Sequence, residues 1–156
     1  MSDTQTSDTF AKNLRVLEYL RKIEIPEILQ GKTEIIYELF RRLCPDPILD
    51  VFISDYIDSE GNRMYEHLRF FSEKYVMSAM NFVTEEDFRI TPIKKQILQI
   101  QIEKQDYDFE NATERSRLSA IVEFGTTKKA VFKASKRNCD YLRNIVRKFI
   151  IPNLQE

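Results

Sequence analysis

The chain contains few of the residues from which phosphate-binding loops and metal centres are usually built. Its 156 residues include three glycines, one histidine and two cysteines. Three glycines are too few for a glycine-rich loop that cradles phosphates, which excludes that kind of site. Cys44 and Cys139 lie far apart in the sequence and lack the spacing of a metal site. We therefore predict neither a metal nor a cofactor.

The same scarcity of cysteine and of long apolar runs bears on the compartment. A disulfide between Cys44 and Cys139 is possible in principle, but a reducing compartment disfavours it, and we interpret both as ordinary, partly buried thiols. No run of about eighteen apolar residues occurs, so the sequence predicts no transmembrane segment. The first ten residues are polar and acidic, unlike a signal peptide. We expect a cytoplasmic protein.

Charge is divided unevenly along the chain. Residues 1–88 carry 10 Lys and Arg against 17 Asp and Glu, whereas residues 89–156 carry 14 against 8. Such a division has three interpretations: a basic surface for an anionic partner, head-to-tail self-association, or two halves that face each other within the fold.

The first 44 residues show helical periodicity. Apolar residues recur at spacings of three and four, and Pro26 interrupts the pattern. A second helix is predicted to start near Thr33 and to end at Cys44, because Pro45 and Pro47 cannot donate backbone hydrogen bonds within a helix. We expect these helices to form an N-terminal extension over residues 1–44.

From residue 48 onwards the period of the apolar residues changes to two, which is typical of strands. A hairpin is predicted around the turn at 59–62, with Ile53 opposite Leu68 and Val51 opposite Phe70 on one apolar face. A tight turn at Ser72–Lys74 leads to a third strand over 75–82, and a short strand ends at Pro92.

A long strand follows, with Leu98, Ile100 and Ile102 on one face. The last hairpin turns around Gly125, and its predicted pairs are Val122–Ala130, Ala120–Phe132 and Glu123–Lys129. Ser135 is then expected to cap a C-terminal helix whose narrow apolar stripe is Leu142, Ile145, Val146 and Phe149.

The passage "FFSEKYVMSA" followed by "ITPIKKQILQIQI" resembles bacterial PH-like and GRAM-like domains, related to the pleckstrin-homology fold. The resemblance implies an α+β fold: a PH-like antiparallel β-barrel of six to seven strands over residues 45–156, capped by a C-terminal helix. It also implies a binding scaffold. The first hairpin, "SDYIDSEGNRMYE", is acidic, however, and would repel an inositol phosphate, and the terminal helix lacks the tryptophan common in such domains.

Two residue pairs on the first hairpin could carry chemistry. The predicted register places Ser54 opposite His67, a couple that suggests a nucleophile and its base, but no elbow glycine or oxyanion donor accompanies it. We interpret His67 as a solvated strand residue. The same register places Asp55 opposite Glu66, and such paired carboxylates could act as acid and base or hold a cation. Alternatively, both acids are solvated, or a bulge turns one away.

A basic cluster in the second half of the chain is the candidate binding site for an anionic partner. Such a patch could meet nucleic acid, an anionic membrane or an acidic protein, or be only a solvated face. Nucleic acid is disfavoured, since "KKAVFKAS" does not match the RNA-recognition signature and the acidic half would repel phosphate. The candidate residues are Lys94, Lys95, Lys129, Lys133, Lys136, Arg143 and Arg147.

The sequence thus predicts a non-catalytic binding or scaffold module that acts through protein–protein contacts, with self-assembly as one form of them. The alternative is a peripheral binder of anionic lipid or another anionic ligand through the basic cluster. A small hydrolase that uses His67 or the carboxylate pair is a third hypothesis.

Overall fold

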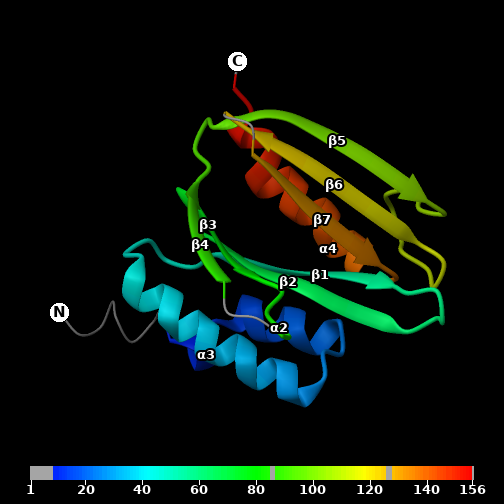
Figure 1. Cartoon of the computed structure of the whole chain (residues 1–156), viewed down its shortest axis with the longest axis horizontal. Helices are drawn as coiled ribbons and strands as arrows, with labels where there is room; N and C mark the ends of the chain where they lie inside the picture. The colour runs from blue at the N-terminus through cyan, green and yellow to red at the C-terminus, as the bar shows by residue number, and fades with distance from the viewer. Residues whose placement is uncertain (1–8, 85–86, 126–127, 156) are drawn as a thin grey trace.

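The computed structural model describes residues 9–84, 87–125 and 128–155, which form an α+β fold of helices and two antiparallel sheets (Figure 1). Along the chain these are η1 (Phe10–Lys12), α2 (Leu14–Lys22), α3 (Glu27–Leu43), β1 (Asp50–Ile57), β2 (Arg63–Phe71), β3 (Tyr75–Met80), β4 (Asp87–Pro92), β5 (Ile97–Gln105), β6 (Arg117–Phe124), β7 (Lys129–Ser135), α4 (Asn138–Ile145), η2 (Val146–Ile150) and η3 (Ile151–Asn153). Within these ranges, no helix combines the length and the apolar character needed to cross a membrane.

The N-terminal region forms two α-helices, as predicted, but the second is longer than expected. The Asn13 side chain caps α2 by accepting a hydrogen bond from the backbone N–H of Val16 at 3.2 Å. Helix α3 begins directly after Pro26, at Glu27 rather than near Thr33. Proline is tolerated at a helix start, because the first N–H groups have no intrahelical partner there. The predicted end before Cys44 is confirmed.

The hairpin of β1 and β2 confirms half of its predicted register. Val51 pairs with Phe70 and Ile53 with Leu68, but a bulge follows Ile53, so that Asp55 pairs with Tyr65. The expected Asp55–Glu66 pair is therefore wrong. A bulge adds one residue to a strand and shifts all later pairs by one position.

The seven strands form two separate sheets. Their orders are β1-β2-β3-β4 and β5-β6-β7, and no strand ladder joins the sheets in the described part of the chain. A closed barrel was expected, and the structure has two open sheets of four and three strands instead. The physical reason lies at the corner between them, where two side chains of β1 occupy the hydrogen-bonding edge of β7: Ser54 and Asp55 accept from the N–H groups of Lys133 and Ser135.

The four-stranded sheet is the middle layer of the molecule. Helices α2 and α3 lie on one side of it, and α4 with the second sheet lies on the other (Figure 1). The Phe70 ring contacts Phe40 on the helical side, whereas Phe71 contacts Phe132 and Phe149 on the opposite side. This double cover explains why six consecutive residues of β1 are buried.

The C-terminal helix α4 continues into the π-helical turn η2, and its predicted stripe is largely confirmed. Leu142, Ile145 and Phe149 are buried, whereas Val146 is only partly buried. Ser135 does not cap this helix. Its hydroxyl donates to the Asp55 carboxylate instead, and the residue directly before α4 is Arg137, which makes no side-chain cap.

The second sheet confirms the predicted pairs of its hairpin and corrects the expected face of β5. Val122 pairs with Ala130, Ala120 with Phe132 and Glu123 with Lys129. Leu98 and Ile102 of β5 remain 50% and 40% exposed. The cause is the outer position of β5, together with a bulge between Ile97 and Gln99 that breaks the alternation next to Leu98.

Candidate functional site

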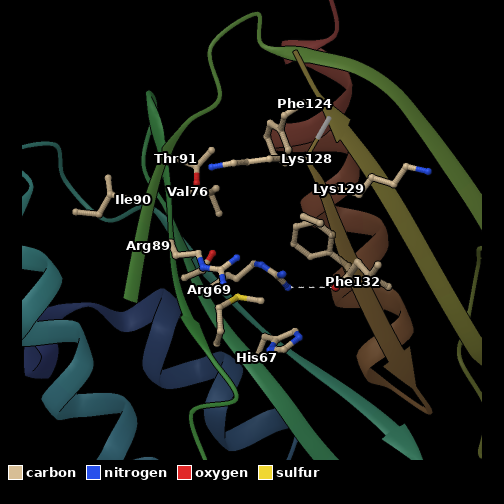
Figure 2. Close-up of a pocket in the computed structure, with 14 residues that line it drawn as sticks. His67, Arg69, Val76, Arg89, Ile90, Thr91, Phe124, Lys128, Lys129 and Phe132 are labelled. Atoms are coloured by element: carbon tan, nitrogen blue, oxygen red, sulfur yellow. Dashed lines mark hydrogen bonds between the residues drawn. The ribbon is translucent and has the colours of Figure 1, made fainter. Parts of the chain in front are cut away.

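An open cleft of about 570 Å³ lies where the two sheets diverge (Figure 2). Alternate residues of β2 and β3 form its floor, and consecutive residues of β4 and of the 128–132 segment form its sides. Side chains of a strand alternate between its faces, so consecutive lining residues mean that a strand presents its edge. The cleft is therefore a stretch of sheet face between two strand edges. Its lining residues are His67, Arg69, Val76, Ser78, Met80, Arg89, Ile90, Thr91, Phe124, Lys128, Lys129, Ala130, Val131 and Phe132.

Two arginines stand in one row on this floor. Arg69 pairs with Ser78, and Ser78 pairs with Arg89, so the three residues lie side by side across β2, β3 and β4. Residues directly opposite each other share a sheet face, and neighbouring strands are about 4.8 Å apart. The backbones of the two arginines are therefore about 10 Å apart, and both guanidinium groups line the same cleft.

Arg69 is the chemically unusual residue of the site. It is only 2% exposed, and its guanidinium donates to the carbonyl of Val131 at 3.3 Å and to the Ser54 hydroxyl at 3.5 Å. Its central carbon lies 4.3 Å from the centroid of the Phe132 ring. Within residues 9–84, 87–125 and 128–155, no carboxylate forms an ion pair with it. Burial lowers the pKa of Arg69 to about 10, so it stays charged at neutral pH.

The remaining cations surround Arg69 unequally. Arg89 forms an exposed ion pair with Asp87 at 2.9 Å. Figure 2 shows the Lys128 side chain extending across the cleft towards Thr91, whereas Lys129 points away from it. The Lys129 ammonium lies 3.4 Å from a carboxylate oxygen of Glu123. Arg69, Arg89 and Lys128 are therefore the cations that a ligand in the cleft would meet.

The pKa of His67 depends on the burial and the charges of this site. Its Nδ1 accepts a hydrogen bond from the backbone N–H of Asn81 at 3.0 Å, and its Nε2 lies 3.6 Å from a Glu66 carboxylate oxygen. Burial lowers the pKa of His67, and Arg69 lowers it further; Lys133 and Arg89 act in the same direction, while Glu66 opposes them. Burial is thus the main reason why a protonated imidazole is disfavoured here, and the cations of the cleft add to it.

Ser54 and His67 do not form the pair expected from the sequence. The Ser54 hydroxyl is buried and contacts Arg69 and the backbone N–H of Lys133. An extra residue in β2 leaves Ser54 opposite both Glu66 and His67 instead of paired with His67 alone. The described residues thus provide no serine–histidine couple on this hairpin.

Asp55 is the centre of a buried structural network. Its carboxylate accepts hydrogen bonds from Arg63 Nε at 2.9 Å, Asn138 Nδ2 at 2.7 Å and the backbone N–H of Ser135 at 3.0 Å, in addition to the Ser135 hydroxyl. These donors tie β1 to β2, β7 and α4. Asp55 is therefore a structural anchor, and in the described part of the chain no group of three or more His, Cys, Asp or Glu residues is placed to hold a metal ion.

The predicted basic cluster does not form one continuous site. Of its seven predicted members, only Lys129 is among the residues that line the cleft. Lys133 lies 4.0 Å from the Glu66 carboxylate and 5.2 Å from the centroid of the Tyr56 ring. Lys136 pairs with Glu114 at 3.2 Å.

The other predicted cations serve local structure or face solvent. Arg143 donates to the carbonyls of Phe109 and Glu110, at 2.5 and 3.1 Å, and so holds the loop between β5 and β6. Lys95 donates to the carbonyl of Pro152 at 3.1 Å. The two remaining members are exposed: Lys94, which lies 4.0 Å from Glu73, and Arg147.

Sequence reasoning missed Arg69, Arg89 and Lys128. A signal for the first of these was present, because Arg69 interrupts the apolar run "HLRFF" and lies next to two residues of the predicted buried face. A charged residue within such a run is either solvated on the opposite face or buried for a reason. Arg89 and Lys128 carried no comparable signal, since charged residues in short outer segments are ordinary.

Comparisons with known proteins add little to this description. No family model matches the chain, and no curated protein matches it in sequence. One solved structure, the C-terminal domain of an unknown protein from Leishmania infantum, is similar with a TM-score of 0.43 and 15% identity; the alignment covers 76% of this chain and 96% of that domain. A match at this level carries no argument about fold family or function.

Proposed function

We propose that this chain is a non-catalytic binding module of PH-like architecture that holds an acidic segment of a partner protein in the cleft between β4 and β7. The order of its elements, strands in two antiparallel sheets followed by a C-terminal helix, supports the PH-like assignment. The acidic residues of the first hairpin, over 54–66, argue against anion binding at its turn and favour the cleft, which begins at His67 and Arg69 further along β2.

Arg69 is buried with no carboxylate paired to it among the described residues, and this observation carries the proposal. Removing a charge from water costs several kcal/mol unless a partner of opposite charge compensates it. Here the partners are a carbonyl, a hydroxyl and the face of Phe132, which are weaker than a carboxylate. An incoming carboxylate would complete the site, and Arg89 and Lys128 would hold further acidic groups.

An acidic protein segment fits this arrangement better than a membrane surface does. A lipid bilayer meets the cations that protrude most, and several surface lysines here already face carboxylates: Lys94, Lys129, Lys133 and Lys136 pair with Glu73, Glu123, Glu66 and Glu114. Arg69, by contrast, is buried on the floor of the cleft, out of reach of a flat bilayer surface.

The hydrogen bonds of the His67 ring agree with a binding role and not with general-base catalysis. Its Nδ1 accepts from a backbone N–H, so the proton of the neutral ring is on Nε2, which faces Glu66. Neither nitrogen then offers a free lone pair to abstract a proton from a bound group.

Fluorescence anisotropy with a labelled peptide of six glutamates tests the proposal. We expect wild type to bind it, more weakly in high salt, and to bind a six-glutamine peptide far less. Arg69→Gln should weaken binding about tenfold or more, the effect of losing one charged hydrogen bond. Arg147→Gln is the matched control, because it removes an exposed cation away from the cleft, and should bind as wild type does.

Vesicles of phosphatidylcholine with phosphatidylserine provide the second arm of this experiment. Failure of the glutamate peptide to bind, or equal binding by both variants, would contradict the proposal. Cosedimentation with the anionic vesicles in the absence of peptide binding would assign the protein to anionic lipid instead.

A further inference from the structure

The outer edge of β7 has two halves: a closed half, whose backbone N–H groups donate to side chains of β1, and an open half, which faces the cleft. The N–H of Phe124 donates to the carbonyl of Lys128 at 3.0 Å, which makes these two residues a hydrogen-bonded pair. In an antiparallel ladder such pairs alternate with non-bonded ones. Ala130 and Phe132 therefore turn their backbone groups towards β6. Lys129, Val131, Lys133 and Ser135 turn theirs towards the outer edge.

Side chains of β1 close the C-terminal half of this edge. The N–H of Lys133 donates to the Ser54 hydroxyl at 3.4 Å, and the N–H of Ser135 donates to the Asp55 carboxylate at 3.0 Å. Ser54 and Asp55 of β1 thus present two acceptors where a continuous barrel would place another strand. This half of β7 is thus complete within the chain.

The N-terminal half of the same edge opens into the cleft. Lys129 and Val131 line the cleft, and their N–H groups have no acceptor among the residues that the structure describes. The outward carbonyl of Val131 accepts from Arg69 at 3.3 Å. The edge therefore offers two backbone donors directly beside the buried guanidinium.

We infer that the acidic segment binds in an extended conformation, as a strand added to the open half of β7. This inference rests on the proposed function and specifies how the ligand is held. Its carbonyl groups would accept from the N–H groups of Lys129 and Val131, and its carboxylates would reach Arg69 and Arg89. Exposed strand edges commonly recruit extended peptides.

The charges at this edge select the added strand. Lysine on an edge normally prevents unwanted pairing between sheets, and Lys128 and Lys129 stand at the entrance to the open half. Like charges across a strand pair are destabilising, whereas opposite charges contribute favourably. The edge therefore disfavours pairing with a second copy of itself and favours a strand rich in Asp or Glu.

The decisive probe is the six-glutamate peptide with every backbone nitrogen methylated, because both edges of the extended peptide are then obstructed. Methylation keeps all carboxylates but obstructs the approach of a neighbouring strand. Strand addition predicts binding about tenfold weaker than that of the unmodified peptide, as expected for the loss of about two backbone hydrogen bonds. On the protein, amide hydrogen exchange of Lys129 and Val131 should slow when the unmodified peptide binds. Exchange of Ala130 and Phe132, already bonded to β6, should change little.

Val131→Pro provides the matching change on the protein. Proline removes the outward N–H of an edge strand, a position where it is tolerated, and should weaken peptide binding; Val131→Ala keeps the N–H and should not. Equal binding of both peptides, with loss in Arg69→Gln, overturns strand addition while the proposed function stands. No binding of either peptide by wild type overturns the proposed function itself. If Val131→Pro fails to fold, the comparison of the methylated and unmodified peptides on the wild-type protein still tests strand addition.

Discussion

The Arg69 guanidinium carbon lies 4.3 Å from the centroid of the Phe132 ring, so that a cation of β2 rests on an aromatic side chain of β7. Because the hydrogen bond to the Val131 carbonyl fixes the same guanidinium, the group is held in place before a ligand arrives. A preorganised cation loses little conformational freedom on binding. This geometry suits the proposed recognition of an acidic ligand better than it suits a stabilising ion pair.

Replacing Arg69 by methionine should separate function from stability. Methionine fills a similar space without burying a charge, and buried charges contribute little to stability relative to apolar residues. We expect the free energy of unfolding of Arg69→Met to stay within about 1 kcal/mol of wild type or to rise, while peptide binding is lost. Urea denaturation and anisotropy measure the two effects. A loss of stability above about 2 kcal/mol would instead make Arg69 a structural residue.

Asp55→Asn should be strongly destabilising. The carboxylate is fully buried and accepts from Arg63, Ser135 and Asn138, so the substitution leaves Arg63 without its counter-charge. We expect a loss of about 3 to 5 kcal/mol in the free energy of unfolding. Asp87→Asn is the control, since the exposed Asp87–Arg89 pair is expected to contribute about 1 kcal/mol or less. Similar losses in the two variants would show that the Asp55 network is not an anchor.

Phe149→Ala tests the packing of the C-terminal helix. Its ring is 8% exposed and stacks on Phe71 with centroids 4.9 Å apart. Truncation should cost about 3 to 5 kcal/mol, measured by urea denaturation. Ile151→Ala, at a residue that is 48% exposed, is the control and should change stability little. A cost below about 1 kcal/mol for Phe149→Ala would mean that the ring is not part of the core.

His67 should make stability depend on pH. Burial and Arg69 lower the pKa of His67 in the folded protein, whereas the unfolded chain titrates near the ordinary value of about 6.5. The unfolded chain therefore binds this proton first, and the stability contributed by neutral His67 is complete above about pH 6.5 and lost as the pH falls through the lowered pKa. Urea denaturation across this range should show a steeper loss for wild type than for His67→Gln. Parallel curves would contradict the lowered pKa.

The helices and hairpins were predictable because their signals are local. Apolar spacing, prolines and turn residues identify α3, the β1–β2 hairpin and the β6–β7 hairpin. A bulge was one of the alternatives for this hairpin, but its position in β2, opposite Ser54, was not predictable, since the period of two continues through it in the sequence. It depends on donors from Ser135 and Asn138, which are distant along the chain. The covering of Phe70 by α3 is likewise a tertiary relationship.

The sequence predicted that the candidate site is basic, but it did not predict which residues form it. The sequence pointed to a basic surface in the second half of the chain, yet Arg69 belongs to the acidic first half. The register of β2, β3 and β4 brings Arg69 into line with Arg89, and the divergence of the sheets adds Lys128 and Lys129. Residue counts along the chain cannot show such convergence, because it arises from strand order.

The pKa of His67, followed by NMR with and without the six-glutamate peptide, is the measurement that tests the cleft most directly. The chain has a single histidine, so its ring signals need no separation from others. Carboxylates bound beside Arg69 would offset the positive charges that lower this pKa. We predict that saturating peptide raises the pKa of His67, and that the six-glutamine peptide does not. Peptide binding with an unchanged or lower pKa would contradict the account, because the ligand would then lie outside the cleft.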